Sequence, residues 1–362
     1  MNTVPVRLKN NSYPILIGSQ MLSKLPGVLK KLDIGHDAVV ITDRSVEKIY
    51  GDKVSSVLKS KGFSVKVISV AAGEKSKSAD VAIRIVEEIA AYDVGREIFI
   101  IALGGGVVGD LAGFVAAIYK RGIPYVQVPT TLLAQIDSSI GGKVGVDLTV
   151  GKNLAGAFHQ PKAVFSDVDL LTTLDGRQIR NGLAEAVKYG VIVDRALFVY
   201  LEKNYEGFLS LDRKVLTRVV QACSRIKADV VSKDEKETKG LRTILNFGHT
   251  LGHALENAAG YHRYHHGEAV ALGMRMAAFI SCRKGMLSQL DFQRINRLLT
   301  RIGLPEMFTN VPQAKILSAM SHDKKFVAGK NRFVLARRIG SVEVVSGVSI
   351  SLIQEALRKY QG

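Results

Sequence analysis

The chain has few cysteines for its 362 residues. Cys223 and Cys282 lie far apart, and neither belongs to a CxxC motif. This spacing excludes a disulfide framework and favours a reducing compartment. The N-terminal residues lack the basic stretch and apolar run of a signal peptide, so we expect a cytoplasmic protein.

Long uninterrupted apolar runs are also scarce. Residues 97–119 are the best candidate for a membrane span, but four glycines and Asp110 lie in their middle. Lipid tolerates neither irregular backbone nor a charge at that depth. We therefore predict a strand, a glycine turn and a helix here, and no association with a membrane.

Acidic residues are outnumbered: 50 lysines and arginines face 33 aspartates and glutamates, a formal net charge of +17. A basic nucleic-acid-binding protein is one explanation. It is disfavoured because the sequence shows no helix-turn-helix signature, zinc-finger spacing or basic-aromatic alternation. A field that attracts a small polyanionic substrate is the preferred interpretation.

Short β-branched runs alternate with helical stretches in the first half of the chain, which is typical of a mostly parallel α/β sheet. Helical periodicity dominates from Thr172 onward, with one expected hairpin at 331–347. We predict an α/β dinucleotide-binding domain over residues 1–175 and a mainly helical metal- and substrate-binding domain over residues 176–362. A cleft between two such domains is the expected place for a site. The predicted strands are 38–42, 64–70, 97–103 and 125–131, and the predicted helices begin near residues 45, 79 and 110.

A glycine turn at Gly104–Asp110 follows one of these strands and satisfies the GxGxxG pattern. Glycine lets backbone approach a pyrophosphate, and free amides at a helix start favour its charge. A purely structural tight turn is the alternative. No acidic residue stands about 20 positions downstream to bind ribose, and Asp43, Glu74 and Lys77 are the candidate substitutes.

The segment 129–161 is polar and rich in glycine, and we expect it to form loops. It carries Asp137, Lys143, Lys152 and Asn153, with two Gly-Lys steps nine residues apart. Exposed loop charge would explain any single lysine. Two such steps favour capture of a phosphate or carboxylate.

Five of the eight histidines lie between positions 249 and 266. His249, His253 and Glu256 share one helical face by their spacing, and Glu185 and Lys188 share a face of another, apolar helix. A buried carboxylate needs a partner. Two imidazoles and one carboxylate with an open position form a catalytic zinc set, and spacing alone favours His249 and His253 as the imidazoles.

Seven motifs together resemble those of the 3-dehydroquinate synthase family, in family order over about residues 40 to 345. They read GGGVVGDLAGF, VPTTLLAQIDSSIGGK, GKNLAGAFHQP, GLAEAVKYG, DEKE followed by LRTILNFGHTLGHALE, HHGEAVALGM and DKKFVAG. The resemblance implies an α/β NAD-binding domain followed by an all-α domain, in a sugar phosphate cyclase with bound NAD and one divalent metal, usually zinc, with cobalt as the alternative. It implies conversion of 3-deoxy-arabino-heptulosonate 7-phosphate to 3-dehydroquinate and phosphate in the shikimate pathway. The implied steps are transient oxidation by NAD, phosphate elimination, reduction, ring opening and an aldol closure, in a homodimeric enzyme.

The resemblance also implies roles for individual residues. The implied metal ligands are Glu185, His249 and His266, which makes His253 a substrate-site residue instead. The implied phosphate-binding residues are Lys152, Asn153, Arg121, His253 and one of Lys324 or Lys325. The residues implied to hold hydroxyls, carboxylate and metal-bound oxygen are Asp137, Lys143, Lys188, Lys227, Arg242 and Asn246. The implied NAD-binding residues are Asp43, Glu74, Lys77, Gly105, Gly106, Val107, Asp110, Thr130, Thr131, Leu133, Thr173 and Gln178, with Lys143 and Lys152 shared between cofactor and substrate.

The sequence departs from the family pattern near the adenosine and over the substrate. Ala71-Ala72-Gly73-Glu74 replaces the usual PDGE, which removes one acidic contact, and Val144–Thr149 lacks a usual Thr and Pro. Two alternative enzymes remain: a sugar phosphate cyclase for a substrate without a carboxylate, and a metal-dependent polyol dehydrogenase that releases NADH. The pair of Arg242 and Lys227 suits a carboxylate and disfavours the first, and the many cationic loop residues disfavour the second.

Overall fold

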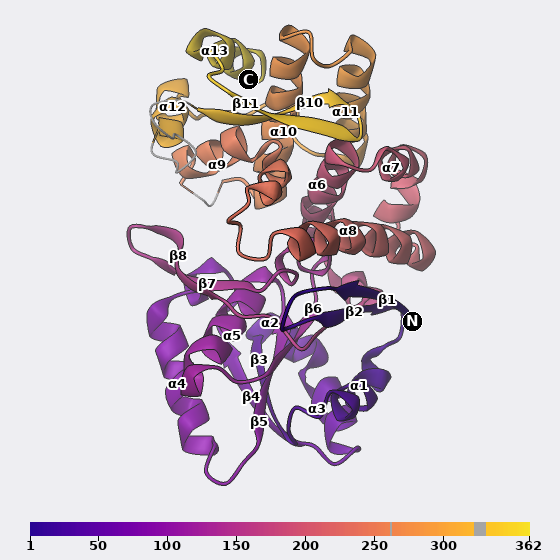
Figure 1. Cartoon of the computed structure of the whole chain (residues 1–362), viewed down its shortest axis with the longest axis vertical. Helices are drawn as coiled ribbons and strands as arrows, with labels where there is room; N and C mark the ends of the chain where they lie inside the picture. Colours follow the sequence, from indigo (N-terminus) through magenta and orange to yellow (C-terminus); the bar gives the residue numbers. More distant parts are fainter. Residues whose placement is uncertain (261–262, 322–330) are drawn as a thin grey trace. The chain divides into compact units, whose positions relative to one another are not determined.

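The structure, a computed structural model, describes residues 1–260, 263–321 and 331–362 (Figure 1). These residues form two compact units. The first unit contains residues 1–174 and 216–236, and the second contains residues 175–215 and 237–362. Lys324 and Lys325 lie outside the described residues.

A seven-stranded sheet organises the described part of the first unit, in the order β1-β2-β9-β6-β5-β3-β4. All neighbouring strands are parallel except β1 and β2. This confirms the predicted α/β fold, although β1, β2 and β9 were not predicted. The strands are β1 (Asn2–Val6), β2 (Tyr13–Gly18), β3 (Asp37–Asp43), β4 (Ser64–Val70), β5 (Ile98–Gly104), β6 (Tyr125–Pro129) and β9 (Ala163–Asp167).

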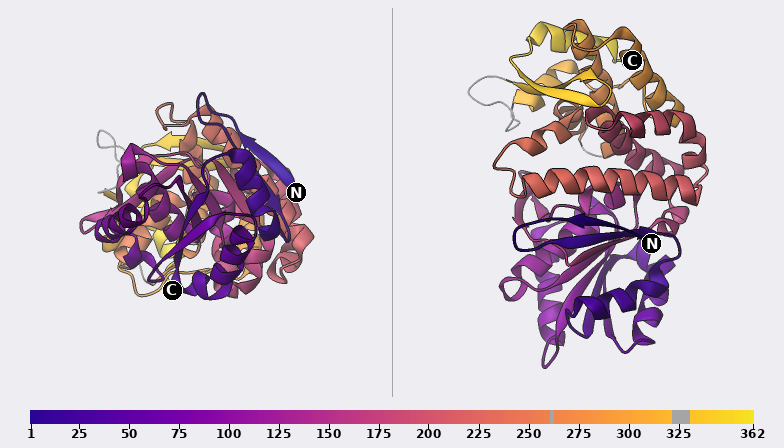
Figure 2. Two further views of the ribbon diagram at one scale, coloured as in Figure 1. Left: turned by 90° about the horizontal axis from the view of Figure 1, so that it is seen from below. Right: turned by 45° about the vertical axis from the view of Figure 1, so that its right-hand side comes forward.

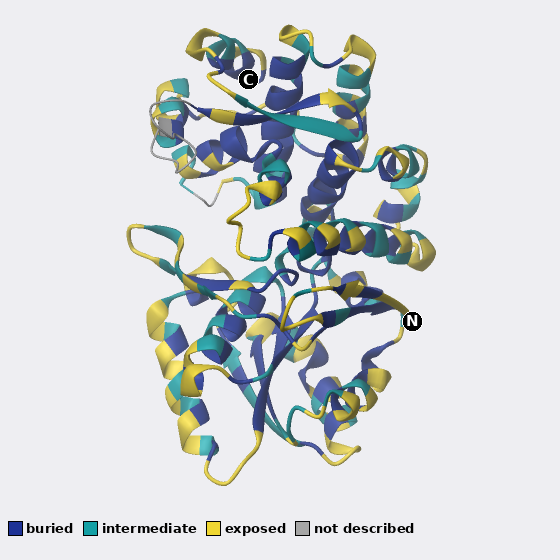
Figure 3. Ribbon diagram, in the orientation of Figure 1, coloured by how far each residue is buried: buried dark blue, intermediate teal, exposed yellow. Residues whose placement is uncertain are grey.

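Helices cover both faces of this sheet (Figure 2). Alternate residues of β3 point to opposite faces, as a strand requires. Ala38 and Val40 pack with α1 and α3, whereas Val39 and Ile41 pack with α4 and α5. Burial on both faces explains why the central strands are continuous apolar runs (Figure 3). The helices are α1 (Leu25–Leu32), α2 (Arg44–Val46), α3 (Asp52–Lys59), α4 (Ala79–Tyr92) and α5 (Gly106–Ile118).

The glycine turn is tighter than predicted. Helix α5 begins at Gly106 and not near Asp110, because the amide of Gly109 already donates to the carbonyl of Gly105 at 2.9 Å. Gly109 is therefore a helical residue. A Cβ there would lie 2.8 Å from Oε1 of Gln127, so a larger residue would require the Gln127 side chain to shift.

The segment predicted as loops is largely ordered. It contains the helical turn η5 (Ala134–Ser138) and an antiparallel hairpin of β7 (Lys143–Leu148) and β8 (Gly151–Phe158). Val144 and Val146 are buried against the first unit, with Val144 packed over Gly113 of α5. The prediction was wrong because the glycines and lysines obscured the alternating apolar residues of β7.

Helices form most of the described part of the second unit, and a β10–β11 hairpin lies where one was expected. Helix α8 differs from the predicted division, because residues 216–236 belong to the first unit. Lys227 of α8 donates to Asp137 at 2.6 Å, which joins this helix to η5. The elements are α6 (Gly176–Ile192), α7 (Arg195–Leu209), α8 (Arg213–Lys233), η7 (Leu241–Asn246), α9 (His249–Ala258), α10 (His266–Arg283), α11 (Gln289–Ile302), α12 (Gln313–Ser321), β10 (Arg332–Arg338), β11 (Ser341–Ser346) and α13 (Ile350–Lys359).

Helices α6, α9 and α10 pack closely through glycines. A Cβ on Gly273 would lie 1.9 Å from the carbonyl oxygen of Gly248, and one on Gly267 would lie 2.0 Å from that of Asn181. Only glycine permits these backbone approaches. Among the described helices, none is both long enough and apolar enough to cross a membrane.

Candidate functional site

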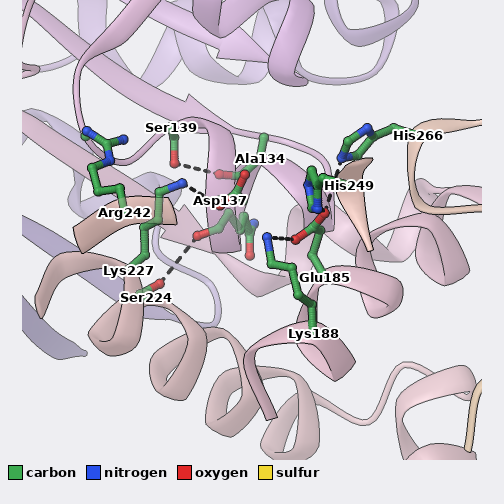
Figure 4. Close-up of polar contacts among 12 residues, drawn as sticks. Ala134, Asp137, Ser139, Glu185, Lys188, Ser224, Lys227, Arg242, His249 and His266 are labelled. Atoms are coloured by element: carbon green, nitrogen blue, oxygen red, sulfur yellow. Dashed lines mark hydrogen bonds and ion pairs between the residues drawn. The ribbon is translucent and has the colours of Figure 1, made fainter. Parts of the chain in front are cut away.

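A cluster of one carboxylate and two imidazoles lies in the second unit (Figure 4). Glu185 comes from the middle of α6, and His249 and His266 are the first residues of α9 and α10. Oε1 of Glu185 lies 3.3 Å from Nε2 of His249 and 3.2 Å from Nε2 of His266. Three ligand atoms from three helices therefore converge on one point.

The charges of this cluster suit metal binding. Burial raises the pKa of Glu185, but the Lys188 ammonium and His249 outweigh it, and the pKa falls well below its ordinary value. Burial and Lys188 lower the pKa of His249. The carboxylate is thus ionised and His249 neutral near pH 7, the forms in which both bind a metal. Lys188, itself buried, forms an ion pair with Glu185.

His266 is held between two carboxylates. Burial lowers its pKa, but contacts with Glu185 and Glu256 raise it to about 10. The ligand atoms of Glu185, His249 and His266 all lie within 4.8 Å of one another. A buried carboxylate with two convergent imidazoles fits a four-coordinate divalent metal with an open position.

His253, which spacing alone favours as a ligand, belongs to a different group. Its ligand atoms cluster with those of Glu256 and His266, again within 4.8 Å, and its side chain is exposed. Helical spacing put His249 and His253 on one face but could not show that His266, from another helix, reaches Glu185.

The other residues implied to hold substrate oxygens divide between the units. In the first unit, Asp137 accepts from Lys227 at 2.6 Å (Figure 4). In the second, Nε of the buried Arg242 lies 3.1 Å from Oε1 of Glu237. Asn246 ends η7, three residues before His249. Both cations therefore have carboxylate partners.

The dinucleotide candidates line one edge of the sheet. Parallel strands bring their carboxyl ends to the same edge. The register pairs Thr42 with Leu103 and Gly104 with Pro129, so the residues after β3, β5 and β6 are neighbours. Those candidates are Asp43, Gly105, Gly106, Val107, Thr130, Thr131 and Leu133.

The start of α5 fits a pyrophosphate. Gly105 caps the helix without a side-chain hydrogen bond, and the first intrahelical amide donor is Gly109. The earlier amides of the first turn have no intrahelical acceptor and carry the positive end of the helix dipole. A Cβ on Gly105 would lie 3.0 Å from Cγ2 of Thr131, a tight contact that favours glycine in this turn. Asp43 is the N-cap of α2, because its Oδ1 accepts hydrogen bonds from the amides of Ser45 and Val46.

A second polar group joins cofactor and phosphate candidates. Nζ of the buried Lys77 donates to Oδ2 of Asp110 and to Oδ1 of Asn153, each at 2.5 Å. Burial lowers the pKa of Lys77, but the neighbouring Asp110 carboxylate raises it by more. The pKa is therefore above its ordinary value, and the side chain stays a charged ammonium. Lys152 lies 3.5 Å from Glu74. The glycine-lysine step at Lys152 is thereby brought to the start of α5.

Some candidates are not brought together. Arg121 is exposed and lies at the far end of α5 from the glycine turn, about 18 Å away by the rise of a helix. Lys143 is exposed at the start of β7. Thr173 contacts Tyr50 at 3.0 Å in the first unit, and Gln178 lies in the first turn of α6 in the second. Lys325 lies outside the described residues.

Two supporting residues were missed. Glu268 accepts from the amide of His265 at 2.9 Å and from Arg177 at 2.7 and 2.8 Å. The side-chain oxygen of Asn181 accepts from the amide of Gly267. A glutamate three residues into a helix is a capping signal that could have identified Glu268; nothing in the sequence marks Asn181.

Solved structures similar to this chain define its class. A 2-deoxy-scyllo-inosose synthase in complex with carbaglucose-6-phosphate, NAD+ and Co2+ superposes with a TM-score of 0.90 at 27% identity, covering 99% of this chain and 100% of that one. A 2-epi-5-epi-valiolone synthase from Streptomyces hygroscopicus subsp. jinggangensis, with NAD+ and Zn2+ bound, gives 0.89 at 27% identity and 98% coverage of both chains. The fold is that of the sugar phosphate cyclases.

The sequence comparisons identify one family among the sugar phosphate cyclases. Models of the 3-dehydroquinate synthase N-terminal and C-terminal regions match residues 67–181 and 182–326. The 3-dehydroquinate synthase of Desulforamulus reducens is 49% identical over 349 residues, covering 96% of this chain and 97% of the relative. The chain belongs to the 3-dehydroquinate synthase family.

Proposed function

We propose that this chain converts 3-deoxy-D-arabino-heptulosonate 7-phosphate to 3-dehydroquinate and inorganic phosphate, as its family name implies. The observation that carries the proposal is the convergence of Glu185, His249 and His266 on one point. It occurs in a chain whose other unit has a glycine turn at the carboxyl edge of a parallel sheet. This combination suits a reaction that needs both a metal and a dinucleotide.

The proposed cofactors are NAD and one divalent metal, zinc or cobalt. The similar cyclase structures contain NAD+ with Co2+ or Zn2+. Bound NAD supplies a hydride acceptor that later returns the hydride, and the metal supplies a Lewis acid for the hydroxyl that is oxidised. Glu185, His249 and His266 would hold the metal, and the residues lining the sheet edge would hold NAD.

The chain's own charged residues have the other tasks. Lys152, Asn153 and His253 would bind the phosphate and stabilise it as it departs, with Arg121 and Lys325 as further candidates. Lys188, buried against Glu185, would stabilise negative charge on the substrate oxygen near this cluster. Asp137, Lys143, Lys227, Arg242 and Asn246 would orient the hydroxyls and the carboxylate.

Phosphate release tests the proposal directly. Purified protein would be mixed with the heptulosonate phosphate, substoichiometric NAD and zinc, and both phosphate and absorbance at the NADH band would be followed. We expect many phosphates per NAD and no net NADH, because oxidation and reduction cancel within one turnover. Glu185→Gln should remove the activity, and Asn257→Ala, an exposed change on the same helix as His249, should retain it. No phosphate release from this substrate would overturn the proposal.

A different sugar phosphate cyclase activity is the second candidate, because the fold matches such enzymes at a TM-score of 0.90. It is less favoured, since identity is 27% there and 49% to a 3-dehydroquinate synthase. Turnover of a heptulose phosphate without a carboxylate, and none of the heptulosonate, would select it. Net NADH accumulation would instead select a polyol dehydrogenase.

We further propose a homodimer that works in the cytoplasm. The homodimer rests on the family resemblance, and the cytoplasm on the two separate cysteines, both free thiols. Light scattering during gel filtration would measure the mass, and a single-chain mass at micromolar concentration would contradict the homodimer.

A further inference from the structure

Glu256 is a buried carboxylate to which the proposed reaction assigns no task. It lies in α9, seven residues after His249, and is 8% exposed. Its Oε2 lies 3.5 Å from Nδ1 of His266, and Nε2 of the same ring lies 3.2 Å from Oε1 of Glu185. Each nitrogen of His266 thus faces a different carboxylate.

The two nitrogens of this ring need different roles if His266 binds a metal. A neutral imidazole carries one proton, so an unprotonated Nε2 requires the proton on Nδ1. A carboxylate opposite that Nδ1–H fixes the tautomer, holds the ring plane and raises the basicity of Nε2. Glu256 is the side chain in position to do this.

His249 has an equivalent arrangement made by the backbone. Its Nδ1 lies 3.2 Å from the carbonyl oxygen of Phe247, which orients the ring without a side chain. His266 begins α10 directly after a loop and has Glu256 in place of such a carbonyl. The two imidazoles are therefore oriented by different groups: a backbone carbonyl orients His249, and the Glu256 carboxylate orients His266.

We propose that Glu256 is a positioning residue that holds His266 in the orientation and tautomer that bind the metal. The inference rests on the proposed metal role of His266. Its alternative is that Glu256, His253 and His266 ligate a second ion, since their ligand atoms lie within 4.8 Å. That use would remove the Nδ1 proton and give His266 two metals to bridge, and His253 is exposed. The positioning role needs no such change.

Zinc affinity and stoichiometry test this role without measuring turnover. Wild type, Glu256→Gln, Glu256→Ala and the neighbouring exposed Asn257→Ala would each be titrated with zinc against a chromophoric chelator, with circular dichroism to verify folding. We expect Glu256→Ala to weaken zinc binding by roughly 10- to 100-fold. Glu256→Gln should lose less, because its amide oxygen still accepts the Nδ1 proton, and Asn257→Ala should match wild type. Nitrogen-15 spectra of the zinc-loaded proteins should show a single His266 tautomer in wild type and a mixture in Glu256→Ala.

Three results would overturn the proposal in distinguishable ways. Wild-type zinc affinity in a folded Glu256→Ala protein would show that Glu256 has no positioning role. Two zinc ions per wild-type chain, falling to one in Glu256→Ala, would make Glu256 a ligand. Unchanged zinc binding in His266→Ala would instead refute the metal site of the proposed function, and with it the basis of this inference.

Discussion

Nε2 of His266 lies 3.2 Å from Oε1 of Glu185, although 81 residues separate them in the chain. The contact depends on how α10 meets α6. Gly267, the residue after His266, packs against the backbone of Asn181, one helical turn before Glu185. The geometry of the proposed metal ligands is therefore set by a helix approach that only glycine allows, in addition to the side chains themselves.

Gly267→Ala should disturb both stability and metal binding. The added Cβ would lie 2.0 Å from the carbonyl oxygen of Asn181, so the helices must separate. We expect a loss of about 1–3 kcal/mol in unfolding free energy, as for other overpacked sites, together with lower zinc content. Thermal denaturation and metal analysis would measure these effects. Gly27→Ala is the matched control, because a Cβ in that helix meets nothing within 4 Å. Equal stability and zinc content in Gly267→Ala and wild type would contradict the argument.

The ligand assignment predicts different zinc contents for two histidine variants. His266→Ala removes an imidazole that reaches Glu185, whereas His253→Ala removes an exposed one that does not join that group. After dialysis, His266→Ala should retain far less zinc than His253→Ala, as measured by atomic emission. Equal occupancy in the two proteins would contradict the assignment.

Glu268 should stabilise the start of α10 in a pH-dependent way. Burial raises the pKa of Glu268, but Arg177 and the amide of His265 outweigh it and lower the pKa below its ordinary value. The folded state therefore favours the carboxylate. Its contribution is present above the unfolded pKa and is lost as pH falls through the folded value.

Glu268→Gln should accordingly lower the unfolding free energy by about 1 kcal/mol at pH 7, a small value because Arg177 is half exposed. The difference from wild type should shrink below about pH 4. Denaturation midpoints from pH 3 to 8 would measure it, with Glu87→Gln, an exposed helical change, as control. A difference that stays constant down to pH 3 would show that the Glu268 charge does not contribute.

The sequence predicted the α/β class because the buried central strands β3 and β5 are apolar on both faces and leave a clear pattern. It did not predict the β7–β8 hairpin, where Gly145 and Gly156 pair across the strands and conceal the alternation. It also did not predict the edge strands β1 and β2, whose short runs resemble loops. Both omissions concern hairpins between neighbouring strands, and β2 additionally pairs with β9, about 150 residues later in the chain.

Sequence spacing also predicted only part of the candidate site. Periodicity placed Glu185 and His249 on helical faces, since such spacing is local. The contact between His266 and Glu185 depends on how three helices pack, which spacing does not encode, so the ring favoured by spacing was His253. Motif resemblance supplied His266, and its Nε2 lies 3.2 Å from Oε1 of Glu185.

Lys77→Met should weaken the connection between the glycine turn and the β8 hairpin. Nζ of Lys77 bonds both Asp110 and Asn153, and Asn153 adopts a left-handed backbone with φ 57°. Without the ammonium, the Asp110 carboxylate loses its ion-pair partner and Asn153 loses a donor. We expect a loss of about 2 kcal/mol in stability and roughly tenfold weaker NAD binding, equivalent to about 1.4 kcal/mol. Calorimetric titration with NAD and chemical denaturation would measure both.

Lys75→Met, a change at an exposed neighbour, should match wild type in each. Wild-type NAD affinity in a destabilised Lys77→Met protein would limit Lys77 to a structural role, and unchanged stability would contradict the argument altogether.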